Sequence, residues 1–313
     1  MQPDTRPRRA WRKQATAVGK RVREGRPGTS GGSAGDREVL DLVAEPYDSV
    51  AESERRLAEL QRAFATREDD RAVFLAVYAR TTEAVAARIE RDEFEDPDWV
   101  ADYLVAFANR YREAVHDYER GDLSAVADPW QLAFDSAAAP DSLVIQDALL
   151  GVNAHINYDL AFALADVGID SERSAKLADH RAVTEVLRTI VDDIQDLLAE
   201  TYAPGLERVD ESMGRADERL AIFTIDECRS SAWRNAVGLT SRFRVRRWFS
   251  RRITHATATG AAYLLLGTRA SDTVQEALGE FESGVETDGQ AEAQHGGAES
   301  QGDSAGDDPV HEM

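Results

Sequence analysis

Residues 151–160 read GVNAHINYDL and belong to a longer apolar run. His155 and Asp159 are four residues apart in it, so on a helix they are neighbours on one face. Apolar residues surround that face, which turns both polar groups toward the protein interior. A carboxylate buried alone is costly, so Asp159 requires a proton, a cation, hydrogen-bond donors or a metal. The surrounding apolar residues are Val144, Ile145, Leu149, Ile156, Leu160 and Phe162.

Apolar residues recur at helical spacing on both sides of this run, and no comparable stretch alternates with the period of two that a strand shows. The pairs Asp96-Pro97, Asp128-Pro129 and Pro140-Asp141 mark helix starts. Residues 167–170 form a hinge, after which Asp170 or Ser171 is expected to cap the next helix. Helices are predicted around residues 50–64, 74–89, 103–115, 140–166, 171–200 and 215–240. The sequence therefore predicts one all-α, bundle-like domain over residues 37–270.

The two ends of the chain carry opposite charge. Residues 1–27 hold nine basic and two acidic residues, whereas residues 280–313 hold ten acidic residues and no basic one. Residues 1–36 are predicted to be a disordered basic arm, and residues 271–313 a disordered acidic tail. The net charge is −21, with only three lysines among 37 basic residues. This balance is typical of proteins kept soluble in a salt-rich cytoplasm, and an acidic mesophilic protein is the alternative.

Several classes of protein are disfavoured. Cys228 is the only cysteine, which excludes an intramolecular disulfide and a cysteine-based zinc cluster and fits a cytoplasmic location. No apolar stretch follows Arg8-Arg9 to complete a secretion signal, and the apolar run 260–267 is too short for a membrane helix of roughly 20 residues. The glycine and serine patterns of serine hydrolases, P-loop proteins and dinucleotide-binding proteins do not occur.

A second polar pair, Asp179-His180, follows the hinge at the same distance as His155 precedes it. If the two helices form an antiparallel hairpin, all four polar residues converge. Two histidines and two carboxylates are a ligand set for a divalent Zn, Mn or Fe ion, which would activate water for hydrolysis. In that hypothesis His155, Asp159 and Asp179 are metal ligands, His180 is a ligand or general base, and Arg229 stabilises an anionic group.

The alternative is a satisfied polar network that fixes the register of the bundle. Asp159 would then be bonded to His155, Tyr158 or an arginine such as Arg181 or Arg229. The spacing of these residues matches no zinc signature such as HExxH, which favours the network.

One arginine-rich segment is positively charged, whereas the chain as a whole is negatively charged. Residues 228–271 contain nine arginines and no acidic residue. Arginines interleaved with aromatic residues bind nucleic acid or anionic membrane surfaces, although pairing with the acidic tail or the acidic body of the same chain is the favoured alternative. The arginines are Arg242, Arg244, Arg246, Arg247, Arg251 and Arg252, around Phe243, Trp248 and Phe249.

Three patterns together resemble a known family. They are the run 151–160, the segment FEDPDWV (94–100) leading into FANRY (107–111), and RSSAWRNA (229–236). They resemble an uncharacterised helical family of actinobacteria and salt-loving archaea, known by a domain-of-unknown-function label, over about residues 65–240. The resemblance implies an all-helical fold and no particular activity. It places five residues at motif positions: His155, Asp159, Asp179, Arg229 and Trp233. It also implies structural roles for Asn153, Asn157 and Tyr158. His180, both ends of the chain and the arginine-rich segment lie outside the resemblance.

Overall fold

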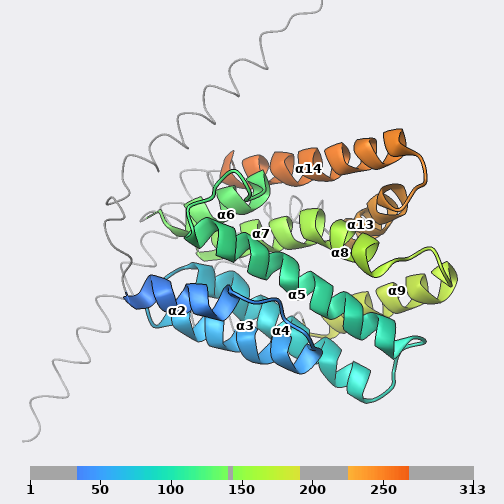
Figure 1. The fold of residues 1–313 in the computed structure, drawn as a ribbon, viewed down its shortest axis with the longest axis horizontal. Helices are drawn as coiled ribbons and strands as arrows, with labels where there is room; N and C mark the ends of the chain where they lie inside the picture. Colours follow the sequence, from blue (N-terminus) through green and yellow to red (C-terminus); the bar gives the residue numbers. More distant parts are fainter. Residues whose placement is uncertain (1–33, 140–143, 191–224, 268–313) are drawn as a thin grey trace, which may run out of the picture.

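The computed structural model describes residues 34–139, 144–190 and 225–267, which are helical and contain no strand (Figure 1). The predicted all-α fold is confirmed. Most of the predicted arm and tail, and the C-terminal part of the helix predicted over 171–200, lie outside the described residues. The first described helix begins at Ala34, slightly before the predicted domain start at residue 37.

Up to residue 190 the described helices follow one another with short connections. α2 spans Ala34–Val43, α3 Val50–Ala65, α4 Arg71–Glu90, α5 Pro97–Glu119 and α6 Asp128–Ala137. A continuous rod follows, made of α7 (Val144–Val152), the π-helix η1 (Asn153–Asp159) and α8 (Leu160–Val167). The remaining helices are α9 (Arg173–Thr189), α13 (Ile225–Leu239) and α14 (Arg244–Gly267).

Helix starts follow the predicted signals in part. Asp96 caps α5 by accepting a hydrogen bond from the Trp99 amide at 3.0 Å, with Pro97 in the first turn. α9 is different, because its N-cap is Glu172, in the left-handed region at φ 49°, and not Asp170 or Ser171. The Asp170 carboxylate instead accepts a hydrogen bond from Thr240 at the end of α13, at 3.2 Å.

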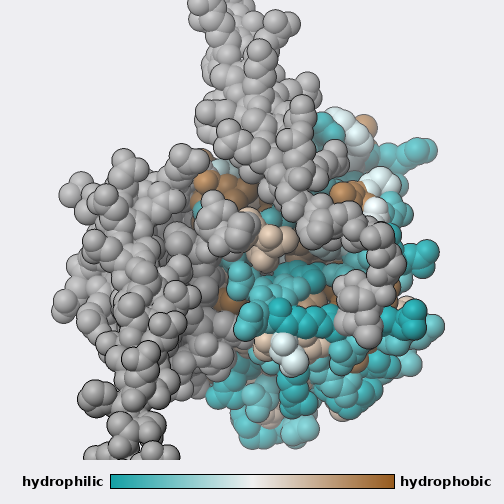
Figure 2. Space-filling model, turned by 90° about the vertical axis from the view of Figure 1, so that its left-hand side faces the viewer, coloured by the Kyte–Doolittle hydropathy of each residue, from teal (hydrophilic) through white to brown (hydrophobic). Residues whose placement is uncertain are grey.

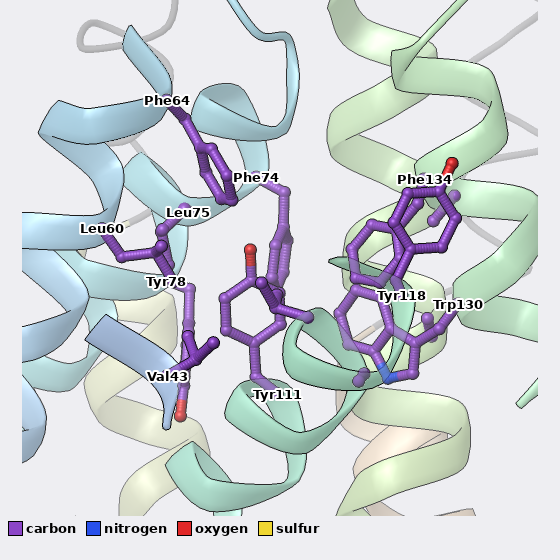
Figure 3. Packing of buried hydrophobic residues seen from close by; sticks show 14 of the residues in the cluster. Val43, Leu60, Phe64, Phe74, Leu75, Tyr78, Tyr111, Tyr118, Trp130 and Phe134 are labelled. Carbon is purple, nitrogen blue, oxygen red and sulfur yellow. The ribbon is translucent and has the colours of Figure 1, made fainter. Parts of the chain in front are cut away.

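Two clusters of buried apolar side chains make up the core. One joins α2 to α7 with α14, and its centre is a group of aromatic rings that includes Phe74, Tyr111 and Trp130 (Figure 3). The other joins the start of α5 with α8, α9 and α13. Phe107 on α5 packs against both clusters, so α5 connects the two halves of the core. The rod approaches α4 closely at Gly151, where a Cβ atom would lie 2.4 Å from the Phe74 ring.

The expected hairpin of the rod with the following helix does not form. α8 packs mainly against α5 and α13, and α9 packs mainly against α4. The hinge explains the difference, because its Gly168 carbonyl accepts hydrogen bonds from Trp99 Nε1 at 3.2 Å and Lys176 Nζ at 2.9 Å. The buried Ile169 side chain follows at once. These contacts hold the hinge against α5 and direct α9 away from α8.

The described surface has the polar character expected of such a charged chain. Hydrophilic side chains cover most of its lower half in the view of Figure 2. Within the described ranges, no helix combines the length and the hydropathy needed to cross a bilayer.

Candidate functional site

His155 and Asp159 meet within η1, as their spacing predicts. His155 Nδ1 lies 3.1 Å from Asp159 Oδ2, and both side chains are buried. The wider turn is evident at the end of η1, where the Leu160 amide donates to the His155 carbonyl five residues earlier. Single π-turns within α-helices are often found at functional sites.

Asp159 has a second donor that the sequence did not indicate. Trp130 Nε1 on α6 donates to the same Oδ2 atom at 2.8 Å. The carboxylate is therefore stabilised by two hydrogen bonds, which corresponds to the network interpretation of this residue. Trp130 is 29 positions away in the chain. No local spacing rule connects the two residues, so sequence reasoning missed this contact.

The His155 imidazole lies in an aromatic surrounding. Its ring stacks on Phe107 with centroids 3.5 Å apart and touches the edge of Tyr78 at 4.3 Å. Burial lowers the pKa of His155, and the bond to Asp159 opposes this shift. The neutral ring donates through Nδ1 and leaves Nε2 as an acceptor. Nε2 is buried and has no hydrogen-bond partner among the described residues.

The two asparagines of the motif connect η1 to α14. Asn153 Nδ2 donates to the Ala258 carbonyl at 2.9 Å, and Asn157 Nδ2 donates to Asn153 Oδ1 at 2.9 Å. Tyr158 is half-buried beside Phe162. The two amide contacts fix η1 against α14, and the structural roles that the family resemblance implies for these residues stay a prediction.

Asp179 lies in a different place from His155 and Asp159. Its two carboxylate oxygens accept from the backbone amides of Glu95 at 2.7 Å and Asp96 at 2.9 Å. It therefore fixes the backbone just before α5. In the structure the Asp179 carboxylate binds backbone amides and does not lie with the other predicted metal ligands. Glu95 is 84 positions from Asp179 in the chain.

His180 is paired with Arg229. His180 Nε2 donates to the Arg229 carbonyl at 3.1 Å, and its Nδ1 accepts from Arg229 Nη2 at 3.3 Å. Burial and the positive charge of Arg229 hold the pKa of His180 well below its usual range. His180 is therefore neutral at pH 7. The Trp233 ring lies beside it, with centroids 5.3 Å apart.

The four proposed metal ligands do not converge. The structure divides them between η1 and α9, and the described residues contain no group of three or more His, Cys, Asp or Glu side chains placed to hold a metal ion. The reason is the missing hairpin, since convergence required α9 to lie against the rod. Within residues 34–139, 144–190 and 225–267, these four side chains form no common ligand set for Zn, Mn or Fe.

A cavity of about 110 Å³ lies between α4, α5, η1, α9 and α13. Arg229 lines it together with Tyr103 and His155, and most of the remaining wall is apolar. The Arg229 side chain is buried and forms no ion pair with a carboxylate of the described residues. The cavity thus combines a largely apolar wall with a buried positive charge. The sequence analysis proposed Arg229 as a group that stabilises an anion, but it predicted no cavity beside this residue.

The six arginines of the segment 242–252 are at the surface. All are exposed, and Arg242, Arg251 and Arg252 lie over the rings of Phe243, Phe162 and Trp248, respectively. None forms an ion pair with an acidic residue in the described parts of the chain; Arg247 donates to backbone carbonyls instead. Pairing with the acidic tail concerns residues 268–313, which lie outside the described residues.

Large apolar side chains are exposed on the same helix. Val245 is 78% exposed and Trp248 61% exposed, whereas Ser250 and Thr254 are buried against the rest of the protein. The other exposed large apolar residues are Phe243, Phe249, Ile253, Tyr263 and Leu264. We call the exposed residues of 242–253 the α14 outer face.

Comparison with known proteins gives a family without an assigned activity. Residues 50–267 match a family model described as a family of unknown function (DUF5995). The match extends beyond both ends of the expected range 65–240 and includes α14, so the arginine-rich segment lies inside the family region and not outside it. No curated protein and no solved structure matches the chain. Because the match covers most of the chain, the protein belongs to the DUF5995 family.

Proposed function

We propose that this protein binds an anionic membrane surface through the α14 outer face. The observation that carries the proposal is the exposure of large apolar side chains on the side of α14 opposite its buried side, with arginines around them. Helices that lie in the headgroup region of a bilayer have this composition.

Helical geometry supports one continuous apolar stripe. At about 100° per residue, Val245, Trp248, Phe249 and Ile253 fall within an arc of roughly 140°. The buried Ser250, Thr254 and Ala258 fall on the other side of the helix. The small side chains allow α14 to pack closely on the protein, and the large ones point to solvent. The helix can therefore stay docked while its outer face enters a bilayer interface.

The arginines are placed to contact lipid phosphates. Arg244 and Arg251 flank the stripe on one side, Arg246 flanks it on the other, and Arg252 lies within it. Long basic side chains at such positions reach out to phosphate while their stems lie on apolar surface. Each basic residue near an anionic membrane contributes about 1 kcal/mol of attraction. The α14 outer face therefore combines electrostatic attraction to lipid phosphates with burial of apolar side chains.

The exposed residues favour a membrane over the other anionic partners. Nucleic-acid surfaces use aromatic rings for stacking on bases, but Val245 and Ile253 do not stack. A symmetric dimer through the same face would bring arginines against arginines, which is unfavourable. A bilayer interface accommodates both the aliphatic and the aromatic side chains.

We propose that the protein is located in the cytoplasm of a cell with a salt-rich interior. Cys228 is unpaired within the chain, as is usual in a reducing compartment. The cytoplasmic leaflet carries the anionic lipids that the arginines would bind.

Vesicle co-sedimentation of the full chain tests the membrane proposal. We expect binding to vesicles of equal parts phosphatidylcholine and phosphatidylglycerol, and little binding to phosphatidylcholine alone. The double variant Arg251→Glu/Arg252→Glu should weaken binding at least about tenfold, because it reverses one charge within the apolar stripe and one charge beside it. Trp248→Ser should weaken it also at high salt, where electrostatic attraction is screened.

Arg55→Glu is the matched control, because Arg55 is exposed on α3 and lies outside the α14 outer face. This variant should bind like the wild type. Equal binding of the wild type and the Arg251/Arg252 double variant would contradict the proposal. Binding to single-stranded RNA in the absence of any vesicle binding would assign the face to nucleic acid instead.

A further inference from the structure

Arg229 is a buried cation, and within the described parts of the chain its side chain donates hydrogen bonds to neutral groups only. Its Nε donates to Thr184 Oγ1 at 2.9 Å, and its Nη2 donates to the Tyr103 hydroxyl at 3.3 Å and to the His180 carbonyl at 3.1 Å. Its Nη1 donates to no atom of the described residues. Dipoles of the described residues therefore solvate the positive charge, and no carboxylate among those residues neutralises it.

The neighbouring ionisable groups do not supply the missing negative charge. His180 is neutral at pH 7, and burial raises the pKa of Tyr103, so the Tyr103 hydroxyl keeps its proton. Asp179 is next to His180 in the chain, but its oxygens are bound to the backbone before α5. A buried charge without a counter-ion is strongly unfavourable. The site therefore favours an anion from outside the described residues.

The cavity beside Arg229 sets the size and character of that anion. An engineered apolar cavity of about 150 Å³ is large enough for benzene, and this cavity measures about 110 Å³. It therefore fits a body of about four to six heavy atoms. Its walls include Val77, Val100, Leu104 and Val183, which favour an apolar body.

We propose that this cavity binds a small monocarboxylate with an apolar chain. The carboxylate accepts hydrogen bonds from Arg229 Nη1 and from the Tyr103 hydroxyl, whose proton is free because its oxygen accepts from Arg229. The apolar chain lies between α4, α5 and α9. One cation in a largely apolar wall matches one carboxylate, whereas a phosphate dianion would require further charged donors.

Isothermal titration calorimetry of the full chain tests this assignment with butyrate and isobutyrate. Butyramide and isobutyramide are the matched neutral probes, since they keep the shape and lose the charge. We expect the carboxylates to bind with Kd below about 1 mM, which is well within the ceiling for ligands of this size. The amides should bind at least about tenfold more weakly, because a hydrogen bond between charged groups is about twice as strong as a neutral one.

Two variants locate the binding to the cavity. Tyr103→Phe removes one donor to the carboxylate and should weaken binding several-fold, whereas Tyr111→Phe removes a buried hydroxyl outside the cavity wall and should leave it unchanged. Val77→Phe fills part of the cavity from a half-buried position, so the fold tolerates it, and it should abolish binding.

Three outcomes would overturn the proposal. They are no heat of binding for either carboxylate at about 10 mM, equal affinity for acid and amide, and undiminished binding by Val77→Phe. Vesicle binding by the α14 outer face is independent of all three, because no residue of that face lines the cavity.

Discussion

At the residue scale, the two buried histidines are both held neutral, and each has a different neighbour. Asp159 accepts from His155, and Arg229 donates to His180. Burial lowers the pKa of both histidines, and Arg229 lowers that of His180 further. The observed hydrogen bonds of both rings need only the single N–H proton of a neutral imidazole.

This protonation state predicts how stability depends on pH. In the unfolded chain both histidines titrate near 6.5, so below that pH the unfolded state takes up protons that the folded state does not. The free energy of unfolding is then fully retained above about pH 6.5 and falls as the pH decreases below it, by up to about 1.4 kcal/mol per pH unit for each histidine. Urea unfolding at pH 7.5, 6.5 and 5.5 measures this slope.

His180→Asn should reduce the slope, because it removes one of the two buried histidines. A free energy of unfolding that is the same at pH 7.5 and 5.5 would show that the buried histidines do not remain neutral in the folded state.

The carboxylate of Asp159 gives a second prediction at this scale. In Asp159→Asn the single amide oxygen accepts from Trp130 or from His155, and the amide hydrogens then face a donor. We expect the free energy of unfolding to fall by about 2–3 kcal/mol, with the helical circular dichroism unchanged. Asp166→Asn, an exposed carboxylate on α8, is the control. If the Asp159 variant is as stable as the wild type, the carboxylate has no structural role.

At the element scale, α14 is held against α13 by a very close approach. A Cβ atom on Gly238 would lie 1.9 Å from Ser250 Oγ and 2.9 Å from Ser250 Cβ. The glycine therefore sets the distance between the two helices and, with it, the position of the α14 outer face. Asn153 adds a hydrogen bond from η1 to the α14 backbone.

Gly238→Ala should push α14 away from α13. Overpacking of this kind costs about 1–3 kcal/mol, more than the roughly 1 kcal/mol that alanine contributes to helix propensity. Chemical denaturation measures the loss, and Gly260→Ala is the matched control, because a Cβ at Gly260 meets no atom. The Gly260 variant should be as stable as the wild type or more so. A Gly238 variant more stable than the wild type would mean that the contact with Ser250 relaxes without cost.

At the scale of the whole molecule, the net charge of −21 opposes compaction, and the α14 outer face is a basic region on an acidic protein. Self-repulsion of this size lowers stability at low ionic strength. The Tm should therefore rise with added NaCl, most steeply below about 0.5 M, since the Debye length is about 10 Å at 0.1 M and 3 Å at 1 M. Differential scanning calorimetry over this range measures the effect. A rise only above 1 M would indicate preferential exclusion of salt instead of charge screening.

The sequence alone determined the features that depend on neighbours along the chain. Helical periodicity gave the all-α class, Asp96-Pro97 marked the start of α5, and the four-residue spacing paired His155 with Asp159. Such contacts follow from helix geometry, whatever the surrounding protein. The tertiary structure alone decided the contacts between distant residues: Trp130 on Asp159, the amides before α5 on Asp179, and Arg229 beside His180. Each depends on the packing of whole helices, and the contacts of α9 depend also on the direction of the hinge at residues 167–170. For that reason the predicted metal ligands lie in two places within the described residues, and Arg229 lines a cavity that the sequence did not indicate.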